Sequence, residues 1–157
     1  MGNQTLVYKA KVQVNLQECY RHLARLNEAF EELEKKYRFP IDADSYVKIT
    51  NSHDIAFSDQ AIYRFSKLQD TMGAKLFKSF LLYQGENIHR PFLDILNTLE
   101  RVGILEVEMW FVLRDLRNEI AHNYEDDEKV VIEILNTIYE QRSALEQILD
   151  NIKESID

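Results

Sequence analysis

The sequence has few of the residues that interrupt helices or cross-link chains. Its 157 residues include four glycines, two prolines and one cysteine. Scarce glycine and proline favour long, uninterrupted helices over a β-rich fold with many tight turns. A single cysteine excludes an intrachain disulfide. Because Cys19 lies on an apolar helical face, we expect it to be a small buried side chain and not a nucleophile.

Long apolar runs are also lacking. No stretch approaches the roughly 18–20 apolar residues that a membrane-crossing helix needs, so we expect no membrane association. The first residues, Met1 to Thr5, lack the charged segment and apolar core of a signal peptide. The sequence therefore predicts a cytoplasmic protein.

Charge is unevenly distributed along the chain. The net charge of −8 argues against broad electrostatic binding of nucleic acid. However, residues 125–157 contain ten acids and three bases, whereas residues 60–90 contain five bases and two acids. The middle of the chain is therefore free to present a positive surface.

Apolar residues recur at helical spacing through most of the chain, typically every three or four positions. Pro40 ends the first such segment, Ser58 is the expected N-cap of the second, and Gly103 suits a left-handed position after the third. Residues 40–58 show no period and predict a loop with a short helical turn. The predicted helices are 12–37, 59–83, 90–101, 106–121 and 127–155. Together they predict one domain over residues 1–157, an all-α, four- to five-helix up-and-down bundle.

One face of the second predicted helix is basic. On an ideal helix, its four cations project within an arc of about 80°, away from the apolar face. They are Arg64, Lys67, Lys75 and Lys78. This stripe is a candidate RNA-binding track, although an ordinary solvated helix face has the same composition.

The segment that suggests chemistry ends the fourth predicted helix and contains Arg117, Asn118 and His122. A histidine moves protons near neutral pH, and an arginine presents a planar fork to phosphate oxygens. RNA carries its own nucleophile, the 2′-hydroxyl. Arg117 and His122 are about 140° apart on an ideal helix, so they converge only if the helix end is distorted or a second copy contributes. A histidine near a helix C-terminus can also be a simple cap.

The string from Arg117 to Tyr124 resembles the Arg-x4-6-His motif of the HEPN superfamily, and more narrowly the Arg-x4-His-x-Tyr form of its HepT-like group. An asparagine directly after the arginine, here Asn118, is typical of that group. The segment from Tyr63 to Asp70 is similar to the second helix of HepT-like proteins. The chain length and the acidic start of the last helix also agree, so the resemblance covers essentially the whole chain.

The resemblance implies a helical bundle that forms a homodimer, bringing two Arg/His pairs into one cleft. It implies the toxin of a type II toxin–antitoxin module, a metal-independent endoribonuclease. His122 would then transfer protons, Arg117 would bind the phosphate, and Asn118 would position the substrate. The resemblance also implies an antitoxin partner, a minimal nucleotidyltransferase (MNT) that transfers AMP from ATP to Tyr124. No cofactor is expected, because ATP serves only as the partner's AMP donor.

A different function fits the same fold. The chain could be a non-catalytic, substrate-binding or regulatory subunit of a nucleotidyltransferase, with the acidic last helix as its docking surface and no need for His122. The four histidines and one cysteine show no metal-ligand spacing. The sequence also has no glycine-rich phosphate loop, which suits a target of AMP transfer better than a transferase.

Overall fold

Helices make up nearly all of the chain in the computed structural model, which describes residues 2–122 and 124–157. No strand occurs within these described ranges, so the all-α prediction is confirmed. The elements, in chain order, are α1 (Gly2–Glu34), α2 (Ala43–Tyr46), α3 (Ser52–Thr71), η1 (Met72–Leu76), α4 (Phe77–Tyr83), α5 (Phe92–Arg101), α6 (Val107–Ile120), η2 (Tyr124–Asp126) and α7 (Glu128–Ile156).

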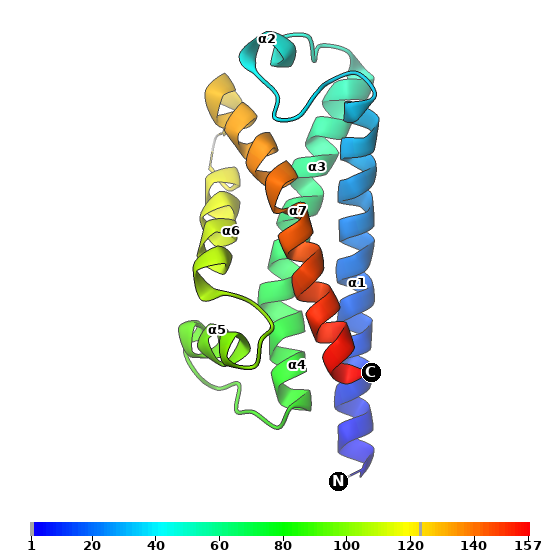
Figure 1. The fold of residues 1–157 in the computed structure, drawn as a ribbon, viewed down its shortest axis with the longest axis vertical. Coiled ribbons are helices and arrows are strands. Elements are labelled where there is room, and N and C mark those ends of the chain that lie inside the picture. Colours follow the sequence, from blue (N-terminus) through cyan, green and yellow to red (C-terminus); the bar gives the residue numbers. More distant parts are fainter. Residues whose placement is uncertain (1, 123) are drawn as a thin grey trace.

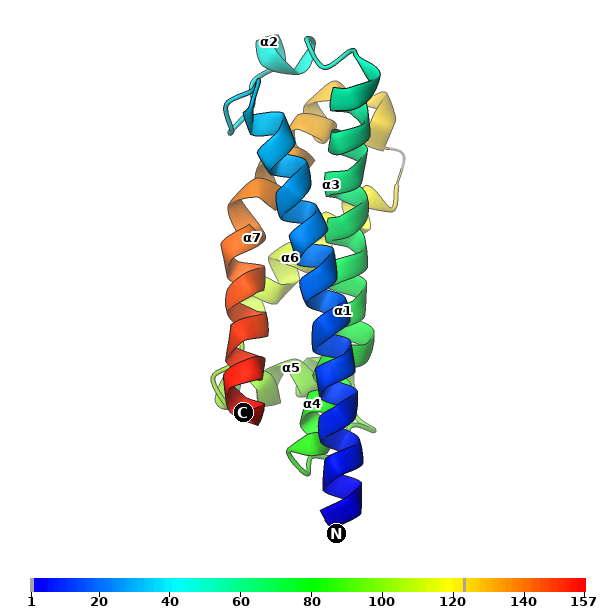
Figure 2. The same cartoon turned by 90° about the vertical axis from the view of Figure 1, so that its right-hand side faces the viewer.

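The long helices run alternately up and down. Helix α1 rises, the continuous rod α3–η1–α4 returns beside it, α6 rises again, and α7 descends to the C-terminus (Figure 1). Helix α5 crosses the lower end and α2 lies at the upper end. Figure 2 shows α6 on the far side of the bundle from α1. Among the helices that the structure describes, none is both long and apolar enough to cross a membrane.

The core lies where the apolar stripes of the long helices meet. Along α1 the predicted stripe is buried, including Cys19, whose side chain has no exposed surface. Burial raises the pKa of the Cys19 thiol to about 12, so it is a packing group, as expected. The largest fully buried side chains are Trp110, Phe30, Phe65, Phe77 and Phe80.

The predicted start of the second helix was wrong by about two turns. Helix α3 begins at Ser52, and its N-cap is Asn51, whose side chain accepts a hydrogen bond from the backbone N–H of Asp54. Ser58, the predicted cap, is buried inside the helix. Ile55 in this first part of α3 is 43% exposed, so residues 52–58 show no regular apolar spacing. The sequence pattern therefore does not reveal that they are helical.

The first helix also begins earlier than predicted, at Gly2 in place of residue 12. Residues 2–7 are exposed, so they add nothing to a buried stripe. The helix ends at Glu34, three residues before the predicted end, and Tyr37 closes the last turn through its N–H to the Leu33 carbonyl at 2.8 Å. The bounds of the last three helices differ from the predicted ones by at most two residues.

The rod α3–η1–α4 changes its winding at η1, which is a π-helical turn. Gly73 lies in this turn, and a Cβ atom there would come within 3.3 Å of the Trp110 ring on α6. The missing side chain therefore allows α6 to approach the rod closely. A π turn inserts extra residues into the helix, so side chains on either side of it no longer follow one 100° progression.

A buried carboxylate joins the end of α1 to the start of α3. Asp54 is fully buried and accepts hydrogen bonds from the Tyr37 hydroxyl, from Asn51 Nδ2 at 2.8 Å and from Lys36 Nζ at 3.2 Å. The Tyr37 hydrogen bond, followed by those of His53, Asn51 and Lys36, outweighs burial and holds the pKa of Asp54 well below its usual range. The same hydrogen bond raises the pKa of Tyr37 to about 12.

We predict that Asp54→Asn lowers the free energy of unfolding at pH 7 by about 2 kcal/mol, because several hydrogen bonds to a charged acceptor are weakened together. The folded pKa of Asp54 is depressed, so this stabilisation is complete above the usual aspartate pKa of about 3.9 and is lost as the pH falls below it. Urea unfolding at several pH values measures the difference between the variant and the wild type.

The difference should be constant between about pH 5 and pH 8 and should shrink below about pH 4. Glu31→Gln, which neutralises an exposed acid on α1, is the matched control and should change little. A difference that persists undiminished at pH 3 would show that the charge of Asp54 is not the cause.

Candidate functional site

The motif arginine is held by a partner on the neighbouring rod. Arg117, in the last turn of α6, donates from Nε to Asp70 Oδ1 and from Nη2 to Asp70 Oδ2, both at 3.0 Å. This pairing is bidentate, so it fixes the plane of the guanidinium as well as its position. Hydrogen bonding of Arg117 to the Asp70 carboxylate is the main reason that the pKa of Arg117 is raised.

The pairing leaves part of the guanidinium available. A guanidinium has five N–H donors, and Asp70 takes one from Nε and one from Nη2. Both donors of Nη1 and the second donor of Nη2 remain, and one donor from each of these nitrogens lies on the end-on edge of the fork. The Arg117 side chain is 29% exposed. Asp70 therefore orients Arg117 while leaving an edge that suits two phosphate oxygens.

Arg117 borders a pocket with a volume of about 460 Å³ between α3, the end of α6 and η2. Tyr124 and Lys67 line the same pocket, so the structure brings together three of the predicted site residues. The remaining lining residues are Asp59, Ile62, Tyr63, Ser66, Asp70, Ile120 and Glu125. The pocket is therefore polar and charged around its mouth, with apolar side chains from α3 and α6.

The other two motif residues lie outside this pocket. Asn118 is exposed on α6, and His122 is exposed just after the helix, whose C-cap is Ala121. The His122 N–H donates to the Glu119 carbonyl at 3.2 Å, which closes the helix end. Asn123 lies outside the described residues. Within one chain, His122 and Arg117 therefore do not line the same pocket.

Tyr124 is half-buried at the start of η2. Burial raises the pKa of its phenol, and the nearby carboxylates Glu125 and Asp59 raise it further. Burial, together with Glu125, also raises the pKa of Asp59. The phenol therefore stays protonated near neutral pH, and any reaction at its oxygen needs a base.

The predicted basic stripe is divided among several surfaces. Lys67 and Lys75 line a groove between the rod α3–η1–α4 and α1, where Lys75 Nζ lies 3.6 Å from Glu18 Oε2, and Lys67 also lines the Arg117 pocket. Arg64 Nη1 lies 3.1 Å from His22 Nδ1 on α1. Lys78 lines a different groove, which faces α6. The π turn at η1 lies between Lys67 and Lys78. Because it changes the winding of the helix, a rotation of 100° per residue does not give the directions of these two side chains around the helix axis.

Sequence reasoning missed several residues of this region. Asp70 was named from the sequence only as the last residue of the segment that resembles HepT-like proteins. Its pairing with Arg117 was not predicted. Arg114 precedes Arg117 by three positions on α6 and faces the same groove as Lys78. His22 is only 9% exposed, and burial and Arg64 lower its pKa. Arg114 could have been predicted from its three-residue spacing to Arg117, which places both arginines near one side of α6. No sequence pattern points to Asp70, because only the packing of α3 against α6 places it opposite Arg117.

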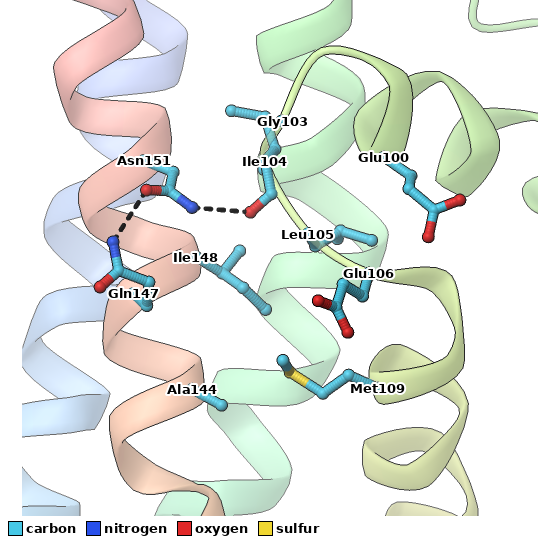
Figure 3. Close-up of a pocket in the computed structure, with 10 residues that line it drawn as sticks. All are labelled: Glu100, Gly103, Ile104, Leu105, Glu106, Met109, Ala144, Gln147, Ile148 and Asn151. Carbon is cyan, nitrogen blue, oxygen red and sulfur yellow. Dashed lines mark hydrogen bonds between the residues drawn. The ribbon is translucent and has the colours of Figure 1, made fainter.

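A second pocket, of about 330 Å³, lies on another side of the molecule, between the α5–α6 turn and α7 (Figure 3). Its polar groups are used within the fold. Asn151 Nδ2 donates to the Ile104 carbonyl at 3.0 Å and Asn151 Oδ1 accepts from Gln147, while Glu100 caps α6 by accepting from the Val107 N–H. No histidine, cysteine or cation lines it, so it offers no comparable chemistry.

Within residues 2–122 and 124–157, no three histidine, cysteine or acidic side chains gather in a way that could hold a metal ion. The chain matches no protein-family model, no curated protein and no solved structure.

We predict that Asp70 and Arg117 are energetically coupled by about 0.5–1 kcal/mol in a double-mutant cycle. This is the upper part of the range for exposed ion pairs, because both side chains are partly exposed and the geometry is bidentate. Urea unfolding of the wild type, Asp70→Ala, Arg117→Ala and the double variant gives the coupling. The single-contact pair of Arg25 and Glu28 on α1 is the comparison and should couple by about 0.3 kcal/mol. Coupling indistinguishable from zero would mean that the pair does not order Arg117 in solution.

Proposed function

We propose that this protein is the toxin of a two-gene toxin–antitoxin module, a metal-independent endoribonuclease that acts through Arg117 and His122 and is neutralised by an AMP-transferring nucleotidyltransferase. The observation that supports this best is the arrangement of Arg117. Its guanidinium is fixed by Asp70, with its end-on edge free, beside a pocket that also contains Tyr124. This arrangement suits a group that binds phosphate.

The proposed reaction needs only the protein and the RNA. The imidazole of His122 takes the proton of a 2′-hydroxyl, and the 2′-oxygen attacks the adjacent phosphorus. Arg117 stabilises the negative charge that develops on the phosphoryl oxygens. The bond to the 5′-oxygen breaks, and this oxygen takes a proton from water or from a second imidazole. The products are a 2′,3′-cyclic phosphate and a 5′-hydroxyl.

A homodimer would bring a second His122 to the site. Phe111, Asp115 and Asn118 follow one another at four- and three-residue spacing, so they share the outward side of α6, and His122 lies just beyond the end of that helix. Phe111 and its neighbour Val112 are 38% and 47% exposed. A second copy packed against this side of α6 would cover the two apolar side chains and place the two histidines near each other.

Tyr124 is the proposed position of AMP transfer. The phenol lies in the pocket beside Arg117, so a nucleotide attached to its oxygen would occupy the space that an RNA phosphate needs. Because burial and the neighbouring carboxylates raise the pKa of Tyr124, the partner's active site would have to supply the base that removes the phenolic proton.

We predict that His122→Ala abolishes growth arrest and lowers the RNA cleavage rate by at least about 100-fold, the usual contribution of general acid–base catalysis. The fold should be retained, because His122 is exposed. Controlled expression, with total RNA examined in parallel, measures both effects. His89→Ala, which changes another exposed histidine, should remain toxic.

Two outcomes would contradict the ribonuclease. Equal toxicity of the wild type and His122→Ala would remove His122 from the mechanism. Absence of arrest and of RNA fragments with the folded, expressed wild type would favour the non-catalytic subunit of a nucleotidyltransferase.

We predict that Tyr124→Phe gains no AMP-sized mass when it is incubated with the partner and ATP, and that it stays toxic when the partner is present. The reason is that phenylalanine lacks the accepting oxygen. Intact-mass spectrometry gives the result directly. Tyr63→Phe alters an exposed tyrosine of the same pocket and should be modified like the wild type. A modified Tyr124→Phe, or an unmodified Tyr63→Phe, would place the modification elsewhere.

A further inference from the structure

A positively charged groove adjoins the Arg117 pocket. It has a volume of about 360 Å³ and lies between the π turn η1 and α6. Asp70, the partner of Arg117, lines both pockets, so the two adjoin at this residue. The other lining residues are Gln69, Gly73, Ala74, Lys78, Phe92, Trp110 and Arg114.

The cations of this groove are unpaired. Neither Lys78 nor Arg114 makes an ion pair with any described residue, whereas Lys75 pairs with Glu18. The only carboxylate in the lining is that of Asp70, and both its oxygens accept from Arg117. In a chain with a net charge of −8, this groove therefore offers two cations from two different elements to an anion.

The floor of the groove is preformed. Gly73 contributes no side chain, and a Cβ atom there would meet Trp110 at 3.3 Å and Phe92 at 3.8 Å. The Arg114 guanidinium carbon lies 5.9 Å from the centroid of the Phe92 ring. The winding change at η1 also turns Lys78 towards α6 and away from the α1 groove. The site therefore combines the space left by Gly73, the aromatic floor and the direction of Lys78. A regular helix would not bring these features together.

We propose that Lys78 and Arg114 form a phosphate subsite for the nucleotide next to the one held by Arg117, on a single RNA strand that follows the groove between the rod and α6. Arg114 precedes Arg117 by roughly one helical turn, about 4.5 Å along the axis, so neighbouring phosphates of one strand meet the two guanidiniums in succession. This inference rests on the proposed ribonuclease function and adds the path of its substrate.

The test is binding of a single-stranded 2′-O-methyl RNA hexamer, which no enzyme of this mechanism can cleave because the 2′-hydroxyl is blocked. Fluorescence anisotropy of the labelled hexamer gives the affinity over a range of salt concentrations. Trp110 is the only tryptophan, so its emission reports independently on the groove floor. The variants are Lys78→Gln, Arg114→Gln and both together. Arg38→Gln with Lys48→Gln, two exposed cations outside the described pockets, is the charge-matched control.

We expect the Lys78/Arg114 double variant to bind about tenfold more weakly than the wild type. We also expect it to reduce the slope of log K against log salt by about 0.7, since Lys78 and Arg114 contact one phosphate and each phosphate contact on a single strand contributes about 0.7. The control should change neither quantity, and Arg114→Lys should recover part of the affinity. Both target side chains are exposed, so the thermal unfolding of the variants should match that of the wild type.

Either of two results would overturn the subsite: hexamer affinity that is independent of Lys78 and Arg114, or an equal loss in the control. If AMP or inorganic phosphate binds as tightly as the hexamer, with the same dependence, the groove is a mononucleotide site and the strand assignment is wrong. Lys78- and Arg114-dependent binding by a protein that cleaves no RNA would uphold the subsite and overturn the nuclease. RNA cleavage together with hexamer binding that does not depend on Lys78 and Arg114 would uphold the nuclease and overturn the subsite.

Discussion

The close contact between Gly73 and Trp110 sets the position of α6, and the candidate site depends on it. Without a side chain at Gly73, the indole packs directly on the π turn of the rod. Trp110 and Arg117 are seven residues apart, so they share the side of α6 that faces the rod. Arg117 can therefore reach Asp70, three residues before Gly73, and pair with both its oxygens. A bulkier residue at position 73 would push α6 outward and separate this pair.

The rod α3–η1–α4 contributes both to the fold and to the proposed phosphate-binding surface. Its first part is tied to α1 through the buried Asp54, its middle holds Arg117 through Asp70, and its π turn brings Lys78 to the α6 side. The overall negative charge is not an obstacle to RNA, because the acids concentrate in α7 and the unpaired cations gather beside α6. In this protein the local pairing of charges decides where a phosphate can bind, and the net charge does not.

One chain holds the phosphate-binding group and the proposed proton-transfer group on different surfaces. Arg117 faces the rod, whereas His122 is exposed beyond the end of α6. Such a separation is a reason for a ribonuclease of this kind to work as a dimer, since a second copy adds its own His122. Tyr124 is half-buried in the Arg117 pocket, so under the proposed function a group that an antitoxin attached there would fill this pocket.

The sequence by itself determined the all-α class, the up-and-down order, most of the buried stripe and the later helix bounds, because apolar spacing reports directly on which side of a helix is buried. It also placed Arg117 and Tyr124 in one short segment. It could not show the early start of α3, since polar residues there lie in a helix without forming a stripe. Only the tertiary structure decided that Asp70 holds Arg117, that Lys78 and Arg114 share a groove, and that His122 lies apart. These relations join residues distant in sequence, and a single π turn alters which of them face each other.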